Sequence, residues 1–532
     1  MNMQDKINEM EEQRKHLCEG GGAAAIEKQH QAGKLTVRER LDRLFDKGTF
    51  KEINLWARPI KTGFDIDNRE LPGDAVVTGV GRINNRPVYV YGHDFTVLGG
   101  TFGAAFRHKV TRIMEMARET GLPIIGVVDS GGERIHDRFG FTTRRPIVDG
   151  AGIGGGASTT YRSPAINSGV IPQITVMLGP SYAGSAYSPT MADFYIMRNH
   201  TAFMSVASPE LLKSVTFADV TQEELGGAEL HATTTGNADF LTETDEEAIE
   251  ICRELVGYLP LNNRESPPII DAGDDPNRRD DRLLGIVSPD LSKPYDMHEV
   301  IHCIMDNGQF LEIQKLFAKS IIIGFACLNG HTVGIVANNP LENGGVLNTD
   351  TCDKEARFIR FCDCFNIPLV FLVDTCGFLS NVEEEQSRNG LLRTAPKPVF
   401  AICEATVPMV VVHVGKCFGL ARMVMGNLKI GVDFVYSWPS AQVARMDPEL
   451  AVDTIYEEEI ASAKNPDEVR KDRLAGLLGE YYNYPYNAAE QLMVNELIDP
   501  RDTRPLLITT LENLVHKKPT PRPWRKHTLI PR

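Results

Sequence analysis

Cysteine is scarce in this chain, and none of it has the spacing of a metal site. The 532 residues include 10 cysteines but no Cys-x-x-Cys pair, and Cys362 and Cys364 are separated by a single residue. Zinc ribbons need such pairs. Of the 13 histidines, only His298 and His302 are four residues apart, and no cysteine pair accompanies them. We expect reduced, mostly buried thiols and no metal site.

Long apolar runs are also missing. A helix that crosses a bilayer needs about 18 or more predominantly apolar residues, and no uncharged apolar stretch of this length occurs. Residues 1–16 carry charges of both signs, lack the apolar region of a secretory signal, and are too acidic for a typical transit peptide. We therefore expect a cytoplasmic protein with no membrane partner.

Basic residues are in the minority. Lysine and arginine total 56 against 71 aspartates and glutamates, so the formal net charge is −15 at pH 7. This balance argues against generic nucleic-acid binding, although a local basic patch could still hold phosphates. Hydrophobic residues make up 42% of the chain and charged residues 24%, as in ordinary globular proteins. A chain of 532 residues is too long for one core, so we expect at least two domains.

An internal repeat organises the sequence. The segment 121–130, Gly-Leu-Pro-Ile-Ile-Gly-Val-Val-Asp-Ser, resembles 366–375, Asn-Ile-Pro-Leu-Val-Phe-Leu-Val-Asp-Thr. The offset is 245 between Asp129 and Asp374 (374 − 129), and it shortens to 236 between Gly179 and Gly415 (415 − 179). Further pairs at these offsets are Asn84 with Asn329, Gly99 with Gly344, Gly100 with Gly345, Pro123 with Pro368, and Pro172 with Pro408. The chain therefore consists of two homologous halves.

Each half has the same predicted elements. Apolar runs at 76–80 and 88–91 predict strands, and a Gly-Gly pair follows them. Helices are predicted at 107–120 and 353–365, since apolar residues in the first recur at the i, i+3, i+4, i+7 spacing. Near-continuous apolar strands then end at Asp129 and Asp374. Strands buried on both faces and alternating with helices indicate an α/β fold with covered sheets.

Turn and linker residues suggest where the halves join. Asparagine, proline, glycine and aspartate are concentrated in 262–280. We predict an N-terminal domain over 1–261, a linker over 262–280, and a C-terminal domain over 281–532. Residues 35–45 predict a short helical arm, and 447–480 is charged and helical in pattern.

Two repeat-related loops carry the strongest chemical signal. Ala183-Gly184-Ser185 in the first loop aligns with Gly419-Leu420-Ala421 in the second, at the offset of 236. Small residues before a helix let a ligand approach the backbone, and they leave N–H groups unpaired in front of the positive end of the helix dipole. Such N–H groups can hold a developing enolate oxygen. The alternative is a pair of tight strand-to-helix turns without a ligand.

Other candidate catalytic residues are weaker. The sequence has no Gly-x-Ser-x-Gly elbow and no Walker A loop, and its one His-Glu-x-x-His string, at 298–302, lacks a further histidine or paired cysteines nearby. Asp129 and Asp374 each end a strand, where a carboxylate can cap the next helix, and we interpret both as structural.

Five segments together resemble the acyl-CoA carboxyltransferases, the family of propionyl-CoA carboxylase beta subunits. These segments are 33–40, 213–228, 357–368, 374–379 and 522–527. The resemblance covers nearly the whole chain and implies two tandem crotonase-like ββα-spiral domains. It further implies acyl-CoA on the N-terminal half and biotin on the C-terminal half. The active site would lie between halves of different subunits in a homo-hexamer, a trimer of dimers.

The resemblance also implies partners and site residues. No Ala-Met-Lys-Met biotinylation motif and no ATP-grasp phosphate loop occur, so the biotin carboxylase and the biotin carboxyl carrier would be separate chains. The N–H groups of Leu420 and Ala421 would hold the biotin ureido oxygen after carbon dioxide is released. Those of Ala183 and Gly184 would hold the thioester oxygen of the coenzyme A ester once its α-proton has been removed.

The sequence departs from the family around both loops, where relatives generally have Gly-Gly-Ala. Met423 stands where propionyl-type enzymes often have aspartate. The residues expected to shape the substrate site are Ser185, Arg144, Arg145, Gly419, Arg422 and Met423. Added apolar bulk and arginine favour an acyl chain that is larger, polar or acidic. Alternatively, Arg422 contacts a neighbouring subunit, and Arg144 and Arg145 bind CoA phosphates or solvent.

Three other functions remain open at this point. The same fold serves decarboxylases that act on methylmalonyl-CoA or glutaconyl-CoA, and partner subunits decide the direction. A biotin-independent hydratase or isomerase would need an acid–base carboxylate near the oxyanion loop, and none is evident in the sequence. A non-catalytic assembly subunit is the third alternative, and Leu420 is its best support.

Overall fold

The computed structural model describes residues 2–134, 136–137, 157–387, 390–484, 486–518 and 524–531. The chain forms two compact units, Met1–Glu265 (unit 1) and Ser266–Arg532 (unit 2), and the boundary falls within the segment 262–280. Within the described ranges, no helix is long and apolar enough to cross a membrane.

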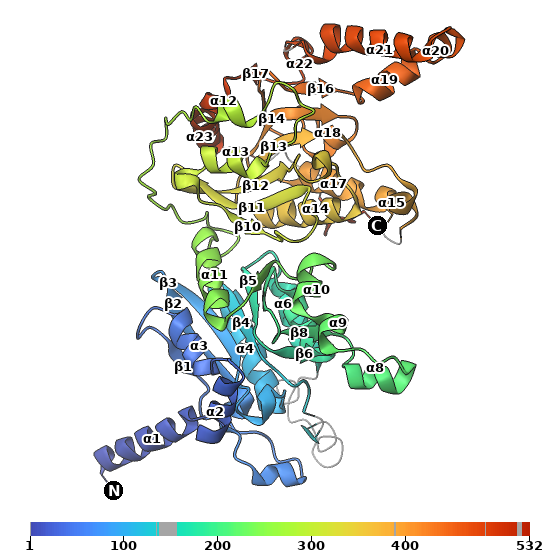
Figure 1. Cartoon of the computed structure of the whole chain (residues 1–532). Coiled ribbons are helices and arrows are strands. Elements are labelled where there is room, and N and C mark those ends of the chain that lie inside the picture. The colour runs from blue at the N-terminus through green and yellow to red at the C-terminus, as the bar shows by residue number, and fades with distance from the viewer. Residues whose placement is uncertain are drawn as a thin grey trace. The chain divides into compact units, whose positions relative to one another are not determined.

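Unit 1 is built on a seven-stranded sheet (Figure 1). Its second strand is antiparallel to the first and the third, and the remaining strands run parallel to the third. In spatial order the strands are β1 (Lys51–Ile53), β2 (Val76–Ile83), β3 (Arg86–His93), β4 (Ile124–Val128), β5 (Gln173–Met177), β7 (Phe194–Arg198) and β9 (Phe240–Thr242). Two further strands, β6 (Pro180–Tyr182) and β8 (Phe203–Ser205), form a small parallel pair.

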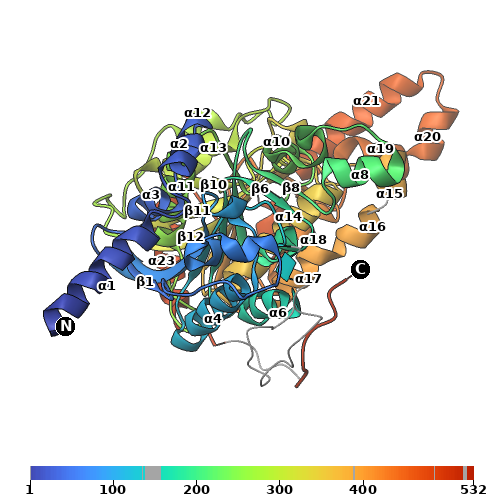
Figure 2. The ribbon, with the colours of Figure 1, turned by 90° about the horizontal axis from the view of Figure 1, so that it is seen from below.

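Helices cover both faces of this sheet. On one face α4 (Ala104–Thr120) buries Val110, Ile113 and Ala117 against the sheet, and α6 (Ala157–Asn167) lies beside it (Figure 2). On the other face lie α3 (Val37–Leu44) and α11 (Asp245–Tyr258). The apolar spacing in 107–120 therefore correctly predicted the buried stripe of α4.

Unit 2 repeats this plan with the same strand directions. In spatial order its strands are β10 (Leu311–Ile313), β11 (Ile321–Leu328), β12 (His331–Asn338), β13 (Leu369–Thr375), β14 (Met409–Phe418), β15 (Phe434–Ser437) and β17 (Glu496–Leu497). The end of β14 also pairs with β16 (Gln442–Ala444), as β6 pairs with β8 in unit 1.

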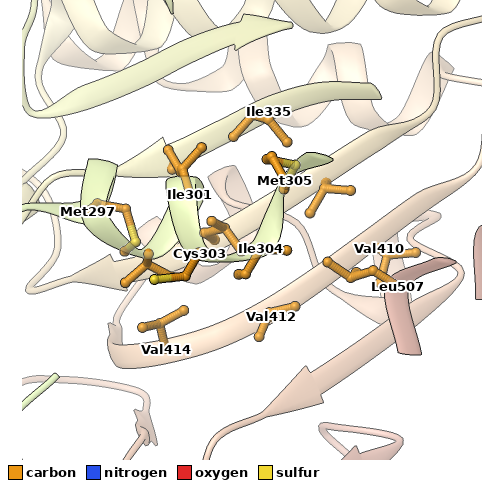
Figure 3. Close-up of a cluster of buried hydrophobic side chains, with 14 of the residues drawn as sticks. Met297, Ile301, Cys303, Ile304, Met305, Ile335, Val410, Val412, Val414 and Leu507 are labelled. Atoms are coloured by element: carbon orange, nitrogen blue, oxygen red, sulfur yellow. The ribbon is translucent and has the colours of Figure 1, made fainter. Parts of the chain in front are cut away.

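The core of unit 2 fills the space between the sheet and helices α13 (Met297–Ile304) and α23 (Thr503–Leu514). Figure 3 shows Ile304 of α13 close to Val412 of β14, whereas Ile301 of the same helix lies on the side of Ile335 in β12. Helices α14 (Thr349–Cys364) and α17 (Pro396–Glu404) pack together on the opposite face. Both faces are covered, and this explains the uninterrupted apolar runs of the central strands.

The repeat extends to buried charged side chains. Lys109 in α4 donates to the backbone oxygens of Gly73 and Val76. At the equivalent position of α14, Lys354 donates to the oxygens of Gln314, Phe317 and Ile321 at distances of 2.8–3.0 Å. Burial lowers the pKa of Lys109 to about 8. A hydrogen-bonded lysine thus ties the main helix to the start of the sheet in each unit.

Most predicted elements are present, with shifted ends. Strands 76–80 and 88–91 become β2 and β3, and helix 353–365 becomes α14. The N-terminal arm is longer than predicted, because α1 (Met3–Cys18) and α2 (Ala23–Gln31) precede α3. The charged segment 447–480 forms α19 (Pro448–Ile455), α20 (Glu457–Ser462) and α21 (Pro466–Leu477).

Candidate functional site

The first loop joins β6 to the single helical turn α7 (Gly184–Tyr187). Ala183, between them, has a φ of 50° and donates its N–H to the carbonyl oxygen of Ser205 at 3.1 Å. The N–H that we assigned to the thioester oxygen is therefore already used within the fold. This corrects the prediction for Ala183, whose backbone anchors the loop to β8.

The unpaired donors of the first loop are the next two residues. Within the described ranges, the N–H groups of Gly184 and Ser185 have no hydrogen-bond partner. The Ser185 hydroxyl donates to the carbonyl oxygen of Tyr182 at 2.6 Å and accepts from the Tyr182 N–H at 3.0 Å. This side chain is fully buried. The Ser185 hydroxyl thus stabilises the loop from within, and the predicted place of Ser185 in the substrate site stays a prediction.

The second loop has the same construction. Gly419 follows β14 with a φ of 61°, and its N–H donates to the Ala444 oxygen at 3.2 Å. The N–H groups of Leu420 and Ala421 have no hydrogen-bond partner in the described part of the chain. Position by position, Gly419 matches Ala183, Leu420 matches Gly184, and Ala421 matches Ser185. Each unit therefore presents two adjacent N–H groups that have no hydrogen-bond partner among the described residues.

The helices behind these donors are shorter than expected. α7 and α18 (Ala421–Val424) contain four residues each. A macrodipole needs several aligned turns, so the expected helix-dipole contribution is small at both loops. An oxyanion at either loop would depend on the two N–H groups themselves. Beside the second pair, the side chain of Leu420 is 74% exposed, whereas Ala421 is fully buried.

Arg422 and Met423 make contacts inside unit 2. The Arg422 Nη1 lies 3.1 Å from the Met493 sulfur, and its Nε is buried without a partner among the described residues. Arg422 is close enough to His413 to add to the effect of burial, which lowers the pKa of that imidazole to about 3. The Met423 sulfur accepts from Asn427 Nδ2 at 2.7 Å. Their substrate contacts stay predictions, and Arg144 and Arg145 lie outside the described residues.

Asp129 and Asp374 are structural, but neither caps a helix. Asp129 is fully buried in ion pairs with Lys34 at 2.7 Å and Arg40 at 2.9 Å. Asp374 accepts from the Tyr295 hydroxyl and the Lys416 N–H, both at 2.9 Å. Burial raises the pKa of Asp374 to about 6. Both carboxylates therefore have the structural role that we inferred, but each links its strand to neighbouring segments instead of capping a helix.

A carboxylate near the first loop was missed by the sequence reasoning. A β-carbon added to Gly184 would lie 4.0 Å from Glu133 Oε1 and 2.6 Å from the Tyr161 hydroxyl. Glu133 also forms an ion pair with Arg107 at 3.2 Å. The backbone of Glu133 forms an isolated β-bridge with that of Phe102, and Phe378 forms the same bridge with Leu347 in unit 2. Phe378 therefore occupies the place equivalent to Glu133. Aligning the two halves of the sequence at the offset of 245 places Glu133 opposite Phe378, and this difference could have identified Glu133.

The geometry favours chemistry that develops negative charge on oxygen. Two adjacent backbone N–H groups can stabilise an oxyanion, and removing one such donor typically costs about 100- to 1000-fold in rate. Two loops of this kind suit a reaction with an enolate on each reactant. Among the described residues, no group of three or more His, Cys, Asp and Glu side chains could hold a metal ion.

Comparison with known proteins agrees with this geometry. Residues 28–530 match the carboxyl transferase domain family. The chain is 42% identical over 531 residues to the propionyl-CoA carboxylase carboxyltransferase subunit of Haloferax mediterranei, covering 100% of both chains. It is 39% identical over 526 residues to the methylmalonyl-CoA decarboxylase subunit alpha of Propionigenium modestum, covering 99% of both.

A solved structure confirms the predicted fold class. The crystal structure of a transcarboxylase 12S hexamer, with methylmalonyl-coenzyme A and methylmalonic acid bound, matches with a TM-score of 0.92. It is 39% identical in sequence, and the match covers 100% of this chain and 99% of that one. Two tandem crotonase-like α/β domains are therefore the fold of this chain.

Proposed function

The chain belongs to the carboxyl transferase family and is a carboxyltransferase, and we propose that it carries a carboxyl group from biotin to the α-carbon of an acyl-CoA. The single observation that supports this most directly is the pair of N–H groups, in each of two equivalent loops, that lack a partner in the described structure. One pair serves the thioester and the other serves biotin. The roles of the predicted domains, 1–261 for acyl-CoA and 281–532 for biotin, form part of this proposal.

On the acyl-CoA side, the N–H groups of Gly184 and Ser185 hold the thioester oxygen. Removing an α-proton places negative charge on this oxygen, and preorganised donors stabilise that charge without reorienting. Ser185 keeps its N–H in place because its buried hydroxyl is fixed to Tyr182. Tyr161 adds a hydroxyl that donates to the Gly184 oxygen at 3.4 Å.

On the biotin side, the N–H groups of Leu420 and Ala421 hold the ureido oxygen. Biotin supplies the carboxyl group when it is bound. These two N–H groups suit such an oxygen, because they are neutral and adjacent and have no hydrogen-bond partner in the described part of the protein. The exposed Leu420 side chain and the neighbouring Met423 add apolar surface beside them. We propose that both residues influence which acyl group is accepted.

We propose that biotin arrives on another chain, because no Ala-Met-Lys-Met motif occurs in these 532 residues. We propose a separate biotin carboxylase and biotin carboxyl carrier as partners, and a homo-hexamer as the assembly. The hexameric transcarboxylase 12S supports the assembly, because the two chains match over nearly their full lengths. The cytoplasm is the proposed location.

The test begins with purification of the tagged chain from its own cells, followed by detection of biotin on co-purifying proteins. The isolated complex is then supplied with ATP, labelled bicarbonate, and acetyl-, propionyl-, butyryl- or dicarboxyl-CoA esters. We expect label in the acyl-CoA only when the biotinylated partner is present. Turnover by the purified chain alone would contradict the proposal. Release of carbon dioxide from methylmalonyl-CoA without ATP would favour the decarboxylase, whose relative in Propionigenium modestum is 39% identical.

A further inference from the structure

We propose that Glu133 is an acid–base group of the acyl-CoA site, with which the chain exchanges the α-hydrogens of an acyl-CoA with solvent in the absence of biotin. This inference rests on the proposed function, because it takes Gly184 and Ser185 as the donors to the thioester oxygen. It adds an activity that the transfer of a carboxyl group does not require.

The distance between Glu133 and the first loop carries the argument. Glu133 Oε1 lies 4.0 Å from the position of a β-carbon on Gly184, and Gly184 carries one of the two free N–H groups. In a thioester held by these groups, the α-carbon is directly bonded to the carbonyl carbon. A carboxylate so close to Gly184 is therefore within reach of the α-hydrogens, as a general base must be.

The surroundings fix this carboxylate in place. Glu133 forms an isolated bridge with Phe102, and Arg107 on the first turns of α4 contacts Oε1 at 3.2 Å. The side chain of Glu133 is 26% exposed and that of Arg107 12%. A half-buried carboxylate held by a guanidinium loses little conformational entropy when a substrate binds, which favours a precise geometry for proton transfer.

The second unit shows that the acid is not a requirement of the fold. Phe378 occupies the place of Glu133, and Cys352 lies at the offset of 245 from Arg107 (352 − 107). The same strand end and helix are therefore built in unit 2 without this ion pair. A structural role common to both repeats does not account for Glu133, whereas chemistry confined to the acyl-CoA side does.

The reaction step is a simple proton transfer. The Glu133 carboxylate removes an α-proton, so a C–H bond breaks and an O–H bond forms, while the electron pair moves to the thioester oxygen. The N–H groups of Gly184 and Ser185 stabilise that charge. Glu133 then returns a proton that has exchanged with water. No oxidant, metal or second substrate is consumed.

The experiment measures deuterium in propionyl-CoA after incubation with the purified full-length chain in D₂O. Mass spectrometry of the recovered ester should show up to two deuterons at the α-carbon. Glu133→Gln should slow incorporation by about 100-fold or more, the usual contribution of general acid–base catalysis. Glu119→Gln is the control, because Glu119 is an exposed residue of α4, the helix that carries Arg107. Glu133→Asp should retain part of the rate.

Calorimetry measures whether propionyl-CoA binds, and this distinguishes a failure of the inference from a failure of the proposed function. Binding without any deuterium incorporation overturns the inference and leaves the proposed function standing. Equal exchange by the chain and its Glu133→Gln variant also overturns it, because the base then lies elsewhere. Absence of binding contradicts the proposed function, and the inference falls with it.

Discussion

Ala183 and Gly419 occupy equivalent positions in the two loops and share a left-handed φ, of 50° and 61° respectively. Glycine adopts this region freely, whereas a β-carbon makes it costly for alanine. The first loop therefore stores backbone strain that the second loop avoids. It is held in this state by the Ala183 N–H bond to Ser205 and by the buried Ser185 hydroxyl.

This difference predicts opposite effects of opposite substitutions. Ala183→Gly should raise the free energy of unfolding of the full chain by about 1 kcal/mol, because relief of the strain exceeds the entropy cost of glycine. Gly419→Ala should lower it by a similar amount. Urea denaturation followed by circular dichroism measures both changes. If both substitutions change stability in the same direction, the assignment of strain to Ala183 is wrong.

The donor role of Leu420 can be separated from its side chain. Leu420 has a φ of −73°, which proline tolerates, and its N–H has no partner in the described structure. Leu420→Pro should therefore fold but lower carboxyl transfer by about 100- to 1000-fold, the typical cost of one oxyanion donor. Leu420→Ala keeps the N–H and is the control. Equal rates for the two folded variants would place the biotin oxygen elsewhere.

The crowding around Gly184 predicts that a substitution there lowers activity and that a second substitution restores it. A β-carbon there would lie 2.6 Å from the Tyr161 hydroxyl oxygen, closer than such atoms approach in proteins. Gly184→Ala should therefore displace the loop or Tyr161 and reduce acyl-CoA turnover by about tenfold or more, the scale on which small misplacements act. Adding Tyr161→Phe removes the crowded oxygen and should restore much of the rate. Steady-state kinetics of both variants in the reconstituted complex provides the measurement, and a double variant no better than Gly184→Ala would contradict the steric explanation.

The sequence predicted the architecture well because burial and repetition leave strong local signals. The apolar strands ending at Asp129 and Asp374, and the stripe on α4, were readable from periodicity alone. The loop positions followed from the offset of 236 between Ala183 and Gly419.

The choice of donors could not be predicted in the same way. Whether an N–H is free depends on a strand elsewhere in the chain, and Ala183 is occupied only because β8 brings Ser205 beside it. The partners of the aspartates were unpredictable for the same reason, since Lys34 and Tyr295 reach them from distant segments. Such non-local contacts leave no pattern in the neighbouring sequence.

One further departure between the repeats concerns stability. Glu355 in α14 is fully buried, and both of its carboxyl oxygens lack a hydrogen-bond partner among the described residues. Its equivalent in α4, at the offset of 245 (355 − 110), is Val110 in the core of unit 1. Burial raises the pKa of Glu355 well above its ordinary value of 4.5. The native state therefore holds this carboxyl group protonated under conditions in which the unfolded chain ionises it.

The contribution of Glu355 to the free energy of unfolding therefore falls as the pH rises. At a pH below 4.5 both states are protonated, so Glu355 contributes no pH dependence there. Above that value the unfolded chain binds fewer protons than the native protein, and the free energy of unfolding falls by up to about 1.4 kcal/mol per pH unit until the native pKa is reached. Glu355→Gln cannot ionise, so its stability should be less dependent on pH by that amount. Glu355→Met, which also removes the unsatisfied polar group, should be about 1–3 kcal/mol more stable than the natural chain near pH 8. Urea denaturation of the three proteins between about pH 5 and 8 provides the comparison, and the raised pKa of Asp374 cancels because all three retain it. Parallel pH profiles for the natural chain and Glu355→Gln would show that Glu355 is solvated or paired in solution.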